Sequence, residues 1–179
     1  LQKLYDTDRI VLATVEADEI GTNQVAILFK IKRKTIAKRI FVKVGQFTGE
    51  TITEQELLLR LNLLTSGNTI SERVLQENAN LILIYLRDRG FFEADVTYNQ
   101  QTLDNDTQVN ITFNVVPNAQ AKVDEFNLVI EKFDKAEVLR KLELQKGEFF
   151  TRAKLNEDVE LIKGGLQDAN FLAPRLNEP

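Results

Sequence analysis

The sequence predicts an α+β protein in which one module, with the order strand, helix, helix, strand, strand, is repeated in tandem. Three observations predict it: a repeat of about 80 residues, apolar residues at helical spacing, and apolar residues at every second position. The repeat divides the chain into the C-terminal part of a module at residues 1–33, a complete module at 34–117 and a third module at 118–179. The third module stops after its second helix.

The joint between helix and strand at residues 71–98 is the clearest segment of the repeat. Ser71 is a good N-cap, because its hydroxyl accepts a hydrogen bond from a backbone amide in the first turn. Gly90 supplies the left-handed conformation that ends many helices, and a strand with alternating apolar residues follows it. In the helix expected between Ser71 and Gly90, apolar residues and one asparagine recur at steps of three and four and should form the buried face. They are Val74, Leu75, Asn78, Leu81, Ile82, Tyr85 and Leu86.

The helix signals of this joint recur about 80 residues apart. Gly67 and Ser71 correspond to Gly147 and Thr151, and the helices that precede them begin with capping boxes formed by Thr53 with Glu56 and by Asp134 with Glu137. At the position of Gly90 the other two copies carry Asp8 and Asn170. Glycine, aspartate and asparagine are the residues that best tolerate positive φ, so we expect the same backbone conformation at all three joints.

The strands of the repeat are predicted from two-residue alternation. A first hairpin runs from Ile10 through a turn at residues 17–22 to Ile31, and its counterpart ends with Val109, Ile111, Phe113 and Val115. The complete module begins with a strand at residues 36–44, and the corresponding strand of the third copy is expected through Val123, Phe126, Leu128 and Ile130. The linkers are too short and too poor in glycine and serine to be floppy, so we expect neighbouring modules to be closely coupled.

The composition argues against several classes of function. The chain has no cysteine and no histidine, so disulfides, Cys/His metal sites and Ser-His-Asp chemistry are excluded, and we expect no catalytic residue, metal or other cofactor. A net charge of −4 argues against a nucleic-acid binder. Asp104 and Asp106 lack the spaced ligands of a calcium loop and indicate a turn. No apolar run approaches the ~20 residues of a transmembrane helix, so this segment is not expected to span a membrane.

The second helix of the complete module and the strand after it resemble a known family. The pattern Leu-x-x-x-Tyr-Leu-x-x-x-Gly-Phe-Phe-x-Ala-x-Val from Leu81 to Val96 is similar to the POTRA (polypeptide transport-associated) domain, as are Gly147, Phe150 and Thr151 at the turn into the third module's second helix. The chain departs from the family at Asp8 and Asn170, where glycine is usual, and at Gly164 and Gly165 inside a helix. The paired glycines indicate a bend or a close neighbour.

The resemblance implies that two antiparallel helices cover one face of a three-stranded mixed sheet, and that the module's second strand lies at the sheet edge. Such an edge accepts an extended peptide as an additional strand. The alternative is that the charged residues there only prevent aggregation. The resulting candidate partner-binding residues are Phe92, Glu93, Ala94, Asp95, Val96, Thr97 and Tyr98.

The function implied by the resemblance is that of the periplasmic POTRA region of a BamA-like outer-membrane protein assembly factor. Its expected partners are unfolded outer-membrane proteins, periplasmic accessory proteins or lipoproteins, and a C-terminal β-barrel of the same parent chain. Alternatives are the POTRA region of a two-partner secretion transporter or of a cell-division protein, which are disfavoured because those proteins carry fewer copies. A hydrolase or nucleic-acid module is the remaining alternative and predicts catalytic activity or salt-dependent binding.

Overall fold

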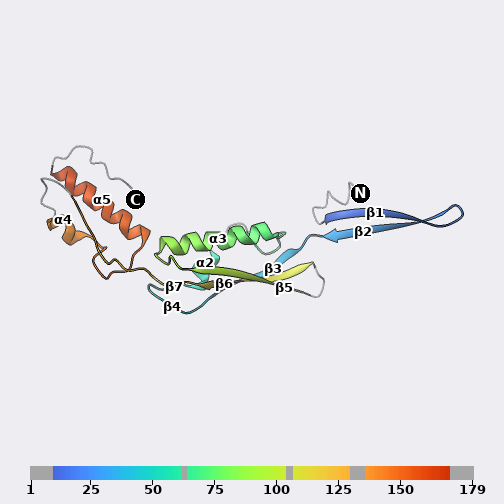
Figure 1. Cartoon of the computed structure of the whole chain (residues 1–179), viewed down its shortest axis with the longest axis horizontal. Helices are drawn as coiled ribbons and strands as arrows, with labels where there is room; N and C mark the ends of the chain where they lie inside the picture. The colour runs from blue at the N-terminus through green and yellow to red at the C-terminus, as the bar shows by residue number, and fades with distance from the viewer. Residues whose placement is uncertain (1–9, 62–63, 104–106, 130–135, 170–179) are drawn as a thin grey trace.

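The computed structural model describes residues 10–61, 64–103, 107–129 and 136–169. A hairpin projects at one end, a helix-covered sheet forms the middle and a helix pair lies at the other end (Figure 1). In chain order the elements are β1 (Ile10–Gly21), β2 (Gln24–Arg33), β3 (Ile36–Val44), β4 (Phe47–Thr48), α2 (Glu54–Leu58), α3 (Glu72–Asp88), β5 (Asp95–Thr102), β6 (Gln108–Val116), β7 (Asn118–Ala119), α4 (Ala136–Lys141) and α5 (Arg152–Asp168).

The middle of the molecule is a three-stranded mixed sheet with the strand order β3-β6-β5. β3 runs parallel to β6, whereas β5 runs antiparallel to it and is joined to it as a hairpin. The short strands β4 and β7 pair in parallel beside this sheet. The predicted α+β fold class, with the order strand, helix, helix, strand, strand, is therefore confirmed.

Helices α2 and α3 cover one face of this sheet. Alternate residues of β6 are fully or almost fully buried, from Val109 to Val115, and they pack with the buried residues of the helices. Burial of each such side chain stabilises the fold by about 1.5–3 kcal/mol. The helix side chains in this core include Leu57, Leu75, Ala79, Ile82 and Leu86.

The helix caps agree with the sequence analysis. In the capping box of α2, Thr53 Oγ1 accepts from Glu56 N at 3.1 Å, and the Glu56 carboxylate accepts from Thr53 N at 3.3 Å. Ser71 caps α3 by accepting from Val74 N, and Thr151 caps α5 by accepting from Lys154 N. Gly67 and Gly147 both have φ of +92°, so the turns before these helices share one conformation. Asp134, Asp8 and Asn170 lie outside the described residues.

The first hairpin differs from its prediction in the position of its turn. β1 continues to Gly21, and only Thr22 and Asn23 connect it to β2. Asn23 has φ of 62°, which asparagine tolerates better than most residues and which tight hairpin turns require. The prediction of a turn over residues 17–22 is therefore wrong, because polar residues on a solvent-exposed ribbon were interpreted as a loop.

The third repeat forms its helices but not its expected first strand. Within the described residues 123–129 there is no strand, and the predicted alternation there is wrong; Ile130 lies outside the described residues. In the complete module β3 obtains its ladder from β6, whereas no described strand pairs with residues 123–129. Helix α5 continues through Gly164 and Gly165, and a β-carbon on Gly165 would lie 2.7 Å from Val138 Cγ2. Gly165 therefore admits a close neighbour, which is one of the two expected outcomes.

Candidate functional site

Strand β5 lies at the edge of the central sheet. Its only pairing partner among the described strands is β6, in a register from Asp95 opposite Val116 to Thr102 opposite Val109. The strand begins three residues later than predicted, because Phe92 and Glu93 form a turn and Ala94 N donates to Phe91 O. Of the candidate partner-binding residues, only those from Asp95 to Tyr98 are in the strand.

The direction of the backbone groups along β5 follows from one hydrogen bond at its end. Leu103 N donates to Gln108 O at 2.9 Å, so Leu103 faces β6. In an antiparallel pair, alternate residues direct both their N–H and C=O groups toward the partner strand. Thr97 and the other odd-numbered residues therefore face β6, and the outward-facing groups belong to Val96, Tyr98, Gln100 and Thr102.

The side chains of β5 fasten the strand to the helix layer. Val96 is buried, and the ring of Tyr98 lies 5.9 Å from that of Phe113. The hydroxyl of Tyr98 donates to Glu72 at the start of α3 over 2.5 Å. This hydrogen bond raises the pKa of Tyr98. The outward edge is therefore held in an extended conformation by contacts made on its other side.

The two phenylalanines before β5 have different roles. Phe91 is fully buried in the core, whereas Phe92 is 52% exposed and its ring lies 5.7 Å from that of Phe150 in the third repeat. The sequence analysis placed Phe92 in the edge strand, whereas it lies in the turn before that strand. The turn after Gly90 directs Phe91 into the core and leaves Phe92 in contact with the next repeat.

Gln120 connects the second and third repeats. Its side chain is almost completely buried, and its Nε2 donates to Arg89 O at 2.8 Å and to Phe150 O at 3.1 Å. Its Oε1 accepts from Glu50 N at 2.7 Å. Gln120 thus satisfies backbone groups from both repeats, which ties them together at a single buried point.

A cluster of charges surrounds this contact. The Glu50 carboxylate is 2.8 Å from Lys154 Nζ and 3.4 Å from Arg89 Nη2, and Arg89 also pairs with Glu56 at 2.7 Å. The hydrogen bond from Lys154 is the main cause that lowers the pKa of Glu50, and burial partly opposes it. Lys154 belongs to α5, so this pair also joins the two repeats. The sequence analysis did not identify the pair of Glu50 with Lys154, because no local pattern reveals a contact between residues about 100 positions apart.

The described part of the chain offers no group of acidic, histidine or cysteine side chains that could hold a metal ion. None of its helices has both the length and the apolar character needed to cross a bilayer.

Comparison with known families decides the identification. Residues 42–118 and 122–179 each match the model of the POTRA family, described as a surface antigen variable number repeat. The chain belongs to the POTRA family. Gln120 lies between the two matched POTRA repeats, which agrees with its role as the contact between them.

Solved structures of POTRA domains also resemble the chain. It is 16% identical to POTRA1-3 of the periplasmic domain of Omp85 from Anabaena, covering 91% of this chain and 67% of that one with a TM-score of 0.40. For POTRA3-5 of BamA from Haemophilus influenzae the identity is 20%, the coverages are 95% and 65%, and the TM-score is 0.42. The chain thus spans about two-thirds of these structures. Among curated proteins the comparison found no match.

The two POTRA repeats contribute differently to the candidate site. The outward edge of β5 belongs entirely to the first matched repeat, whereas Phe150 of the second repeat contacts Phe92 in the turn just before β5. The second POTRA repeat therefore supports the segment that leads into the edge strand and leaves the edge itself uncovered by any described strand.

Proposed function

We propose that this chain is the periplasmic POTRA region of an outer-membrane protein assembly or insertion factor. In this role it binds unfolded outer-membrane polypeptides and accessory proteins by strand addition, and it has no catalytic activity. The parent protein attaches it to the outer membrane through a C-terminal barrel. Membership of the POTRA family and the tandem arrangement support this proposal.

The observation that carries the proposal is the outward edge of β5. Four consecutive even-numbered residues direct N–H and C=O groups away from β6, and no described strand pairs with them. An extended peptide can form a backbone ladder there, and such a ladder depends little on the side chains of the peptide. A factor that handles many unfolded clients requires this kind of weakly selective binding.

A pair of proline substitutions tests strand addition. Gln100 and Gln101 are adjacent and exposed, but the amide of Gln100 faces outward and that of Gln101 faces β6. Gln100→Pro removes one outward donor and leaves the β5–β6 ladder complete. With a peptide of about ten residues copied from an outer-membrane barrel strand, we expect Gln100→Pro to weaken binding about tenfold, equivalent to one lost hydrogen bond.

Gln101→Pro is the control for damage to the sheet. It should lower the stability of the module more than Gln100→Pro does, because it removes a hydrogen bond of the existing ladder. In the unsubstituted protein, hydrogen exchange at the amides of Val96, Tyr98 and Thr102 should slow when the peptide is added. Unchanged exchange at these amides, or full peptide affinity in Gln100→Pro, would contradict binding at this edge.

A further inference from the structure

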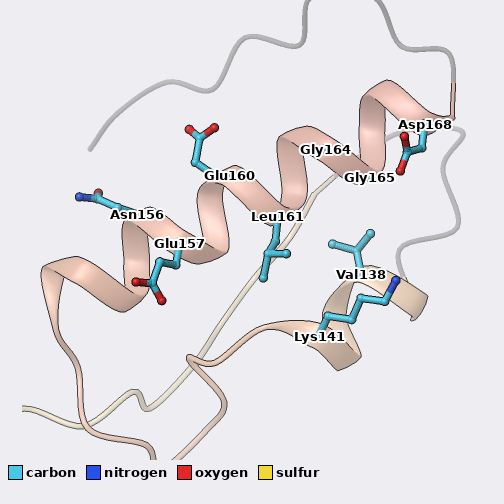
Figure 2. A pocket seen from close by; sticks show the side chains of 9 residues that line it. All are labelled: Val138, Lys141, Asn156, Glu157, Glu160, Leu161, Gly164, Gly165 and Asp168. Carbon is cyan, nitrogen blue, oxygen red and sulfur yellow. The ribbon is translucent and has the colours of Figure 1, made fainter.

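A groove lies between helices α4 and α5 of the third repeat (Figure 2), and these helices lie at the end of the molecule away from most of β5 (Figure 1). Its volume is about 730 Å³, within the range of sites that hold small ligands or side chains. Leu161 extends from α5 toward α4, and Val138 and Lys141 of α4 face it (Figure 2). Leu161 is 43% exposed, so the apolar floor of the groove is open to solvent.

The preceding repeat shows what fills the same place. Helices α3 and α5 have the same length and equivalent caps, so Ile84 and Tyr85 of α3 occupy the positions of Gly164 and Gly165 in α5. In the preceding repeat Arg60 lies over the ring of Tyr85, with its guanidinium carbon 4.2 Å from the ring centroid. A tyrosine covered by a cation therefore closes the space between the two helices.

The third repeat keeps the cation and lacks the ring. Lys141 stands at the position of Arg60, and the two glycines take the place of Ile84 and Tyr85. A β-carbon on Gly164 would meet no described neighbour within 4 Å, whereas one on Gly165 would collide with Val138. Gly164 therefore leaves the rim of the groove without a side chain, and Gly165 allows Val138 of α4 to approach α5.

The charges around the groove favour a positively charged partner. Glu157 and Asp168 extend from α5 on the side of α4, whereas Glu160 points away (Figure 2) and pairs with Lys163. The ammonium group of Lys141 is hydrogen-bonded to Glu137 at 2.9 Å, which leaves the rim with an excess of carboxylate. Lysine or arginine beside a bound side chain would complement this rim.

We propose that the groove between α4 and α5 docks an aromatic side chain of a partner polypeptide that carries a basic residue next to that side chain. The aromatic ring packs over Leu161 and beside Lys141, much as the ring of Tyr85 packs beside Arg60 in the preceding repeat. This contact is separate from strand addition at β5, so either can fail while the other holds.

Titration of the full chain with the peptide acetyl-Lys-Tyr-Lys-amide tests the proposal. Glycine amides are well separated in nitrogen-15 spectra, so Gly164 and Gly165 report directly on the groove. We expect saturable shifts at both amides. Gly164→Ile, which restores the residue of the preceding repeat, should weaken binding about tenfold without lowering the melting temperature, because it fills open space and removes a helical glycine.

Three comparisons complete the test. Lys141→Ala should weaken binding, whereas Lys146→Ala, in the exposed turn outside the groove, should not. Acetyl-Glu-Tyr-Glu-amide should bind more weakly than the lysine peptide, and acetyl-Lys-Ala-Lys-amide should not shift the glycine amides. The proposal would be overturned if the glycine amides showed no saturable shifts or if the acidic peptide bound as tightly as the lysine peptide. Full affinity for the lysine peptide in both single variants, Gly164→Ile and Lys141→Ala, would also overturn it.

Discussion

The backbone of Gly90 lies so close to the carbonyl oxygen of Phe150 that a β-carbon on Gly90 would overlap it. Gly90 also has φ of +82°, a conformation that costs other residues about 1–2 kcal/mol. The glycine therefore meets two requirements at once, one local to the end of α3 and one imposed by the next repeat. Ala121 N donates to Gly90 O at 2.9 Å, which completes the contact.

Gly90→Ala should separate these two requirements when it is compared with Gly67→Ala. Gly67 has φ of +92° but no neighbour within 4 Å of a β-carbon, so its substitution carries the conformational cost alone. We expect Gly90→Ala to lower the free energy of unfolding by about 1–3 kcal/mol more than Gly67→Ala does, because the chain must also shift away from Phe150. Urea denaturation measures both values. Equal losses would show that the close approach is unimportant.

Gln120→Ala should loosen the link between the two repeats. The substitution leaves Glu50 N, Arg89 O and Phe150 O without their buried partner, so we expect a loss of about 2–4 kcal/mol. Small-angle scattering should show a broader distribution of distances, since the repeats then reorient. Gln55→Ala, at an exposed position of α2, is the control and should change neither quantity.

Asp158→Ala should destabilise the third repeat. The Asp158 carboxylate is completely buried and accepts from Glu143 N at 2.8 Å and Leu144 N at 2.9 Å. Its loss leaves two amides unsatisfied, at a cost of about 2–4 kcal/mol. Asn78 occupies the corresponding position in α3, so Asp158→Asn should be tolerated better. Hydrogen exchange at Glu143 and Leu144 measures the difference, and equal exchange in both variants would refute this role.

Acid should weaken the contact between the repeats through Glu50. The pKa of Glu50 is lowered in the folded protein from its ordinary value of 4.5, chiefly by Lys154. Its stabilising contribution is therefore complete above pH 4.5 and disappears as the pH falls through the lowered folded value. Glu50→Gln should reduce the loss of stability between pH 5 and pH 2, as measured by urea denaturation at each pH. An identical pH profile in this variant would exclude Glu50 as the cause.

Much of the fold followed from local patterns. Thr53 with Glu56, Ser71, and Gly90 in its role of ending α3 act through neighbours within a few residues, so these roles can be read from the sequence. The alternation in β6 also predicted its buried face correctly. The prediction was wrong where local polarity was ambiguous, as in β1, which continues through residues that resemble a turn.

The candidate site was only partly predictable. The sequence indicated a strand after Gly90, and its edge position came from the resemblance to the family. The structure then placed Phe92 outside the strand and against Phe150. The register between β5 and β6 decides which amides of β5 face outward. A shift of one residue would turn the odd-numbered amides outward and the even-numbered ones toward β6.

The sequence by itself determined the repeat, the helix caps and the order of strands and helices, because these depend on hydrogen bonds and apolar spacing within short segments. Only the tertiary structure decided how consecutive repeats meet, through Gln120, Lys154 and the bare backbone of Gly90. It also decided that a groove opens beside Leu161 and Gly164 of α5, whereas Val138 closes against Gly165, the counterpart of Tyr85. These features arise between segments far apart in the chain, where close packing and buried polar groups select the contacts.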